Sequence, residues 1–174
     1  MKMRTTIDLQ EQNVNTRKMA LPLPEINGIL QHAAACRWWS LIDMLKAFEQ
    51  VCIIPEHVAR STITTPDENT IISNVMQIGD CNASAMWQAL MNHIFSSYIG
   101  KFMDVYLDDI IVYSDSLEKH IGHIKLIIDI LHREQLYLSE GKLNFLVPEL
   151  TILGCVIDHE GIRMDLDKVD ALVK

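Results

Sequence analysis

The segment Phe102–Tyr113, which reads FMDVYLDDIIVY, decides the fold of this chain. Two apolar runs flank the adjacent carboxylates Asp108 and Asp109. This pattern predicts a β-hairpin with both carboxylates at its tip. Two carboxylates inside a buried strand pair are expensive to desolvate unless a cation or hydrogen-bond donors compensate for their charge. The segment alone therefore indicates either a metal site or an ordinary Asp-Asp turn in solvent.

A third carboxylate favours the metal site. Asp43 ends the apolar run Trp38–Ile42, which is expected to form another strand. Phosphoryl transfer by a polymerase requires carboxylates from separate strands that hold two divalent ions roughly 4 Å apart. Magnesium suits such a site because it prefers oxygen ligands and keeps bound water. Asp43, Asp108 and Asp109 are therefore the candidate ligands of a two-metal nucleotidyltransferase.

The rest of the pattern predicts an α+β fold, with helices packed on one face of an antiparallel sheet. We expect helices over about 26–33 and 82–98, and a third that Asp115 caps. Strands are expected over 38–42, 48–54, 62–65, 70–76 and 150–157, besides the hairpin. In the third helix, a stripe of apolar residues is predicted to be buried: Leu117, Ile121, Ile124, Ile128 and Leu131. In the second helix, apolar residues recur every four positions: Met86, Leu90, Ile94 and Tyr98.

Composition fits one globular domain inside the cell. The chain has 174 residues, of which 49% are hydrophobic, so it can bury a core. No apolar run approaches the ~20 residues that span a bilayer, and Met1–Gln12 lacks the apolar stretch of a signal peptide. The four cysteines are widely spaced without a CxxC pair, which favours reduced thiols over a zinc site. We expect a cytoplasmic or nuclear location and no membrane partner.

Charge is the one feature that argues against a nucleic-acid enzyme. The net charge is −8, and there is no Lys or Arg between Ser61 and Gly100. Phosphate backbones are bound mainly by these two residue types. This gap therefore bears on whether the chain is active.

Tyr106–Asp109 (YLDD) resembles the YxDD box of reverse transcriptases, in the form that gypsy-type LTR retrotransposons use. Five further segments resemble family motifs in the same order and spacing. These are Leu21–Ile26 (YPLPxI), Ser40–Asp43 with Phe48 and Gln50 (SxxD…(Y/F)xQ), Gln88–Asn92 (FQxLMN), His120–His123 (EEHLxHL), and Ile152–Gly154 with Gly161 and Ile162 (FLGxxIS..GI). Six matches in register make the resemblance specific.

The resemblance implies a single reverse transcriptase-like domain over 1–174, with palm and partial fingers but no thumb. Residues 21–100 would hold the start of the palm and the fingers, 101–157 the catalytic hairpin and palm, and 158–174 the start of a following segment. The chain would then be a fragment of a retroelement polyprotein, present in the cell or in a retroelement particle. Its partners would be an RNA or DNA template with a primer and deoxynucleoside triphosphates.

The resemblance also implies roles for individual residues. Asp43 and Asp108 would be the principal ligands of two Mg²⁺ ions, or of Mn²⁺, with Asp109 a less direct carboxylate. Lys142 would lie near the pyrophosphate and could donate a proton. The substrate-binding residues would be Arg4 at the triphosphate, Phe48 under the deoxyribose, Gly79 and Tyr106. His120 and His123 are expected on the helix surface rather than as ligands.

The departures from the family pattern gather in the fingers. Gln10 replaces the arginine of DYRxLN, Thr64 replaces a basic residue, and Asp80 stands where an apolar residue is usual. Gln77 and Ser84 replace the two prolines of MPFGLxNAP. The chain thus keeps the predicted metal ligands, whereas residues of the predicted substrate-binding surface depart from the family pattern.

Two functions therefore stay open: a polymerase, and a non-catalytic remnant that at most binds nucleic acid or a partner weakly. A metal-dependent phosphatase would leave Phe48, the PLP segment and the primer-edge segment unexplained.

Overall fold

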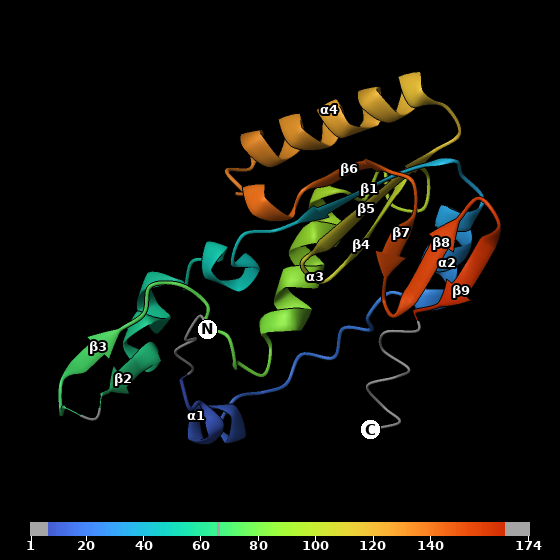
Figure 1. Ribbon diagram of the computed structural model, residues 1–174. Helices are drawn as coiled ribbons and strands as arrows, with labels where there is room; N and C mark the ends of the chain where they lie inside the picture. The colour runs from blue at the N-terminus through green and yellow to red at the C-terminus, as the bar shows by residue number, and fades with distance from the viewer. Residues whose placement is uncertain (1–6, 66, 166–174) are drawn as a thin grey trace. The chain divides into compact units, whose positions relative to one another are not determined.

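A computed structural model describes residues 7–65 and 67–165. Within these residues the chain forms two compact units. The first comprises 7–22 and 46–90, and the second 23–45 and 91–165. Each unit is described separately below, and Figure 1 shows the elements of both. The three candidate metal ligands belong to the second unit.

The second unit is built on a four-stranded sheet in the order β4-β5-β1-β6. Its strands are β4 (Met103–Tyr106), β5 (Asp109–Ser114), β1 (Trp38–Asp43) and β6 (Asn144–Val147). β5 pairs antiparallel with both β4 and β1, and β1 pairs antiparallel with β6. Of the two runs expected to flank the carboxylates, β5 thus lies inside this antiparallel sheet and β4 forms one of its edges.

The predicted hairpin is confirmed. Tyr106 pairs with Asp109 at the end of the β4–β5 ladder, which leaves Leu107 and Asp108 as the two-residue turn. Leu107 has a φ of 52°, in the left-handed region that the tight hairpin turns require. Asp108 therefore lies at the tip, and Asp109 is the first residue of β5.

The fold class is confirmed, but helices lie against both faces of the sheet rather than one. Neighbouring residues of a strand point to opposite faces. On β1, the Trp39 indole N–H donates to the carbonyl of Ala33 in α2 (Ile26–Ala34), 2.8 Å away. The next residue, Ser40, forms a hydrogen bond with His120 of the helix that follows β5. That helix runs along the sheet in Figure 1.

One apolar cluster holds α2 against the sheet. Each large apolar side chain that is fully buried stabilises the fold by about 1.5–3 kcal/mol. The cluster joins α2 and the central strands to β7 (Leu150–Ile152) and β8 (Cys155–Asp158). Its buried members are Ile29, Leu30, Ala33, Trp39, Ile111, Tyr113, Leu150, Ile152 and Ile157. The helix expected over about 26–33 is therefore confirmed.

The helix after the hairpin, α4 (Leu117–Arg133), differs from expectation in its cap and its buried face. Its cap is Ser116, whose hydroxyl accepts from the Lys119 amide, rather than Asp115. The expected stripe is partly exposed: Leu117, Ile121 and Ile128 have 40%, 41% and 37% of their surface in solvent. The buried residues are His120, Ile127, Ile130 and Leu131. The expected surface position of His120 is wrong, because serine hydroxyls satisfy both of its ring nitrogens.

The C-terminal part of the second unit is a three-stranded antiparallel sheet in the order β7-β8-β9. The single strand expected over 150–157 is two strands, because the chain turns at Leu153 and Gly154, which have φ angles of 52° and 81°. β9 (Gly161–Met164) pairs with β8. Between α4 and β6 lies the short 3₁₀ helix η3 (Glu140–Lys142), which carries Lys142.

The first unit contains α1 (Gln10–Val14), the 3₁₀ helices η1 (Ala47–Gln50) and η2 (Pro55–Ser61), and the ribbon of β2 (Thr62–Thr64) and β3 (Thr70–Ile72). The ribbon confirms the two strands expected around a turn. The strand expected over 48–54 is wrong. Lys46 has a φ of 46° and Pro55 begins η2, so only an isolated bridge from Cys52 to Val75 remains there.

Helix α3 (Ala83–Ile94) is shorter than the predicted 82–98. Its buried residues include Trp87, Gln88 and Met91, whereas Met86 is 44% exposed. The predicted four-residue repeat therefore lay one position away from the true buried face. Among residues 7–65 and 67–165, no helix is long and apolar enough to cross a bilayer.

Candidate active site

The candidate metal ligands meet at one end of the central sheet. Asp43, at the end of β1, pairs directly with Asp109, at the start of β5. The carbonyl of Asp108 accepts a hydrogen bond from the Met44 amide at 3.0 Å, which fixes the hairpin tip beside the end of β1. Backbone pairing thus brings together three carboxylates that lie 65 and 66 positions apart in the sequence.

This cluster is rich in negative charge. The pKa of Asp109 is raised to about 6, first by its burial and then by the charges of Asp108 and Asp43. Lys142 opposes this shift only in part. The three carboxylates therefore lack positive charge, and a divalent cation would supply it.

Lys142 is the cation that the fold brings to the cluster. Its Nζ lies 2.7 Å from Oδ2 of Asp43, and this ion pair raises the pKa of the lysine. Two backbone contacts hold the neighbouring segment on β1: the Ser139 amide donates to the Asp43 carbonyl at 3.0 Å, and Leu138 bridges to Met44. The structure thus joins Lys142 to the site, although 99 positions separate it from Asp43.

The donor set fits a hard divalent ion, because it consists of carboxylate oxygens at the end of a sheet. Within 7–65 and 67–165, however, no three His, Cys, Asp or Glu side chains are grouped closely enough to hold a metal ion. Asp43 is instead engaged by Lys142. An ion at this site would therefore compete with Lys142 for the Asp43 carboxylate.

The remaining site residues are distributed over both units. Tyr106 is half-buried at the end of β4 and packs against the apolar cluster of α2. Phe48 is half-buried in η1 of the first unit. Gly79 also belongs to the first unit and has a φ of 105°, which suits glycine. Arg4 lies outside the described residues.

Asn13 organises the backbone around Gly79. Its side chain donates to the Gly79 carbonyl and accepts from the Cys81 amide, both at 2.8 Å. Asp80 lies between them and accepts from the Asn82 amide at 2.7 Å. Asp80 thus forms an Asx turn immediately before α3, a structural role that the sequence reading missed.

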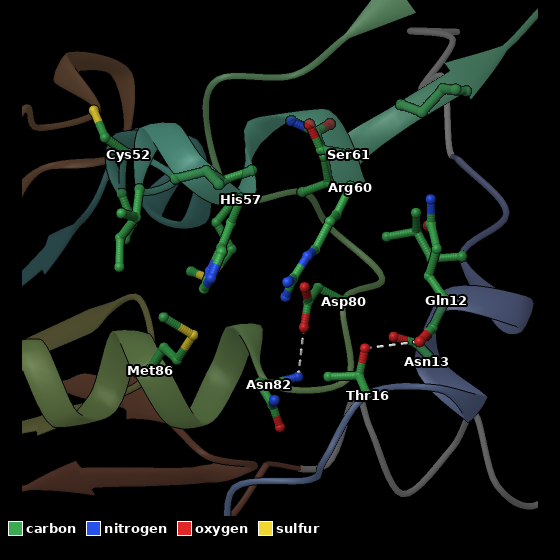
Figure 2. A pocket seen from close by; sticks show the side chains of 17 residues that line it. Gln12, Asn13, Thr16, Cys52, His57, Arg60, Ser61, Asp80, Asn82 and Met86 are labelled. Atoms are coloured by element: carbon green, nitrogen blue, oxygen red, sulfur yellow. Dashed lines mark hydrogen bonds between the residues drawn. The ribbon is translucent and has the colours of Figure 1, made fainter.

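A pocket of about 320 Å³ opens beside this turn in the first unit. Figure 2 shows Arg60 and Asp80 at the pocket, with Gln12 and Asn13 of α1 on one side and Met86 of α3 below. Much of the remaining lining is apolar: Leu9, Val51, Ile53, Ile54, Ile63 and Met76. Asp80, which stands where the family usually has an apolar residue, therefore faces a pocket that a ligand can enter.

Comparison with known proteins assigns the family. Residues 1–157 match the family described as reverse transcriptase (RNA-dependent DNA polymerase). The chain therefore belongs to the reverse transcriptase family. It is 33% identical over 172 residues to the retrovirus-related Pol polyprotein from transposon 297 of Drosophila melanogaster, covering 99% of this chain and 16% of that protein. It is also 30% identical over 128 residues to an RNA-directed DNA polymerase homolog of Oenothera berteroana, covering 72% and 89%.

Solved structures confirm the polymerase fold. A foamy viral protease-reverse transcriptase in complex with ds DNA superposes with a TM-score of 0.89 at 20% identity, over 98% of this chain and 30% of that one. The same viral protein in complex with an RNA/DNA hybrid gives a TM-score of 0.85 at 20% identity, over 96% and 22%. The chain spans about a sixth of the length of the transposon polyproteins it matches.

The charge of Asp109 should destabilise the fold when no cation is bound. Because its pKa is raised in the folded chain, the folded state binds more protons than the unfolded state between about pH 4 and 6, and stability falls as pH rises through that window. We expect Asp109→Asn to raise the free energy of unfolding at pH 7 by about 1 kcal/mol, allowing for solvent screening of this half-buried group. Urea unfolding at pH 4 and pH 7 measures the difference. Asp129→Asn, on the exposed surface of α4, is the control, and an Asp109→Asn chain no more stable than its parent at pH 7 would contradict the expectation.

A second stability defect lies in the first unit. Gln12 Oε1 is buried and has no hydrogen-bond partner among the described residues, while its Nε2 donates a long 3.5 Å bond to the carbonyl of Thr62. An unsatisfied buried acceptor costs about 1–3 kcal/mol. We expect Gln12→Leu to stabilise the chain by about 1–2 kcal/mol, measured as a higher urea midpoint. Gln10→Leu makes the same change at an exposed position of α1 and should have little effect. Equal midpoints for the two variants would show that Gln12 Oε1 is solvated.

Proposed function

We propose that this domain catalyses the addition of deoxynucleotides to the 3′ end of a primer, directed by an RNA or DNA template. One observation carries the proposal: Asp43 and Asp109 pair across adjacent strands, with Asp108 beside them at the hairpin tip. Carboxylates from separate strands at one end of a sheet are what two-metal nucleotidyl transfer requires. The membership of the reverse transcriptase family supports this reaction.

Two Mg²⁺ ions, or Mn²⁺, would be held by Asp43 and Asp108, with Asp109 contributing charge. Bound there, they would lower the pKa of the primer hydroxyl and neutralise the charge of the leaving pyrophosphate. The ion pair with Asp43 raises the pKa of Lys142, so its ammonium stays charged and is suited to hold the pyrophosphate. To donate a proton to the pyrophosphate, Lys142 would first have to leave Asp43.

We propose that the template and primer form a duplex that the domain holds through its backbone and shape. The structurally similar foamy viral protein is in complex with ds DNA and with an RNA/DNA hybrid in two of its solved structures. A-form hybrids offer sugar hydroxyls and phosphates rather than readable base edges. Binding by this chain should therefore be independent of sequence.

A second candidate function follows from the distribution of charge along the chain. Between Ser61 and Gly100 the chain has no Lys or Arg, and the net charge is −8. A surface of this kind binds phosphates poorly. The domain would then be a non-catalytic remnant that at most binds nucleic acid or a partner weakly.

Primer extension separates the two functions. A labelled DNA primer on an RNA and on a DNA template is incubated with the purified chain, all four deoxynucleotides, and Mg²⁺ or Mn²⁺. Product that disappears in Asp108→Asn supports the polymerase, even when only one nucleotide is added. Product that persists in Asp108→Asn comes from a contaminant and counts against it. No product, with a folded chain, favours the remnant.

Sugar selection gives a prediction on the same assay. If the half-buried ring of Phe48 closes the floor under the deoxyribose, Phe48→Val opens space for a 2′-hydroxyl. We expect the use of ribonucleotides to rise by about ten- to hundredfold relative to deoxyribonucleotides. Single-nucleotide incorporation with each sugar measures the ratio. Phe48→Tyr keeps the ring and should leave the ratio unchanged. If Phe48→Val also leaves it unchanged, Phe48 is a packing residue only.

A further inference from the structure

A network of hydrogen bonds connects α4 to the central sheet close to the candidate site. His120 is fully buried, with its Nε2 2.8 Å from Ser40 Oγ and its Nδ1 2.9 Å from Ser114 Oγ. Ser114 Oγ is also 2.8 Å from Nδ1 of His123. Ser40 Oγ accepts the Leu146 amide at 3.0 Å. Two serines and two histidines thus form one continuous chain of contacts.

Only one direction of proton donation satisfies the whole chain. With the Leu146 amide donating to it, Ser40 can give its hydroxyl proton to Nε2 of His120. The ring proton then lies on Nδ1 and is donated to Ser114, whose hydroxyl donates to His123. Among the hydrogen bonds of the described residues, the reverse direction leaves the Ser40 hydroxyl proton without an acceptor.

The imidazole ring of His120 must also be neutral for this scheme of proton donation. Burial, followed by the charge of nearby His123, lowers the pKa of His120 to about 4. The second histidine is likewise shifted downward by burial and by Lys119. At pH 7 both rings therefore have one acceptor nitrogen each, as the donation scheme requires.

The network joins the elements that carry the site. Ser40 lies on β1, three residues before Asp43, and Ser114 ends the strand that Asp109 begins. Leu146 lies on β6, four residues after Lys142. A single buried ring therefore connects both carboxylate-bearing strands, and Ser40 connects β1 to the strand that follows the lysine. Side-chain hydrogen bonds of this kind restrict how packed elements slide past one another.

We propose that His120 is a positioning residue of the active site, held as its Nδ1–H tautomer by Ser40 and Ser114. The inference rests on the proposed polymerase function for its catalytic consequence. Its structural content is independent of that function: the network keeps β1, β5 and β6 in the alignment that places Lys142 against Asp43. No contact between His120 and substrate is involved.

The tautomer gives the first test. ¹⁵N-resolved NMR of the histidine rings at pH 7 distinguishes a protonated Nδ1 from a protonated Nε2. We expect His120 to carry its proton on Nδ1, opposite to the Nε2–H form that free histidine favours, and to keep it there down to about pH 5. A proton on Nε2 of His120 would overturn the proposal.

Hydrogen exchange gives the second test, at the site itself. The Ser139 amide donates to the Asp43 carbonyl, so its protection reports how firmly the lysine-bearing segment is held on β1. In Ser40→Ala we expect this amide to exchange about tenfold faster, while amides of the β7–β8 ladder keep their rates. Ser40→Thr retains a hydroxyl and should restore protection, and Ser96→Ala, at an exposed serine, should have no effect.

The outcomes separate this inference from the polymerase proposal. Unchanged Ser139 exchange in Ser40→Ala, or exchange that rises equally in all ladders, would overturn the positioning role whether or not the parent extends primers. Failure of the parent to extend primers, combined with an Nδ1 proton and local loss of protection, would overturn the polymerase and leave the positioning role intact.

Discussion

Thr64→Arg combined with Asp80→Leu should raise primer extension by about a hundredfold or more over the unmodified chain, which we expect to extend primers very poorly. Metal ions stabilise the transition state only when triphosphate and primer are already aligned. In the family that alignment depends on basic residues of the fingers, whereas Thr64 is an exposed neutral residue of β2. Each charge-assisted contact is worth about 1.5–3 kcal/mol, or roughly 10- to 100-fold in rate.

The structure suggests the controls for this experiment. Asp80→Leu removes a negative charge but also the Asx turn before α3, whereas Asp80→Asn removes the charge and keeps the turn. Thr64→Gln lengthens the side chain without adding charge. If charge is the cause, Thr64→Arg with Asp80→Asn should gain activity and Thr64→Gln should not. Robust extension by the unmodified chain would contradict the expectation and show that the fingers are functional as they stand.

Asp108→Asn should abolish the response of the chain to Mn²⁺. The parent is expected to bind the ion weakly without substrate, because three carboxylates meet with one ammonium. Binding appears as paramagnetic broadening of NMR signals from the β4–β5 hairpin. Asp108→Asn removes one charge from the carboxylates that hold the ion, so this broadening should disappear. A similar response in the variant would refute the assignment of Asp108 as a ligand.

Two further variants test whether this effect is local to the site. Asp129→Asn removes one carboxylate from the exposed surface of α4 and should leave the Mn²⁺ response unchanged. Lys142→Met frees Asp43 from its ion pair and should tighten Mn²⁺ binding severalfold. Because a general effect of net charge would change binding in the same two directions, the unchanged response of Asp129→Asn is the result that identifies a local site.

The parts of the fold that sequence predicted correctly are those with strong local signals. The hairpin follows from two apolar runs around two carboxylates, and β1 follows from an apolar run that ends at Asp43. Asp43 was grouped with Asp109 as a candidate metal ligand, but the pairing of their strands was not predicted, because no local rule sets which strands of a sheet are neighbours. The Lys142 contact was beyond local reasoning for the same reason.

The errors have a common physical cause. The buried face of α4 was misplaced because His120 was assigned to the helix surface, whereas its hydrogen bonds to Ser40 and Ser114 permit full burial. The predicted face of α3 followed an apolar repeat that begins at Met86, whereas the polar Gln88 is fully buried. The strand expected over 48–54 failed because apolar composition does not reveal the left-handed Lys46 that precedes η1. Tertiary context outweighed local pattern in each case.

The ion pair between Lys142 and Asp43 has a consequence for the preparation of this domain. The ammonium of Lys142 lies where it would compete with a divalent ion for Asp43, and it partly neutralises the carboxylates. We therefore expect the chain to stay folded in chelating buffers, apart from the loss of stability that the charge of Asp109 causes, unlike proteins whose cores depend on a bound ion. Metal loading then becomes a separate, reversible step under experimental control.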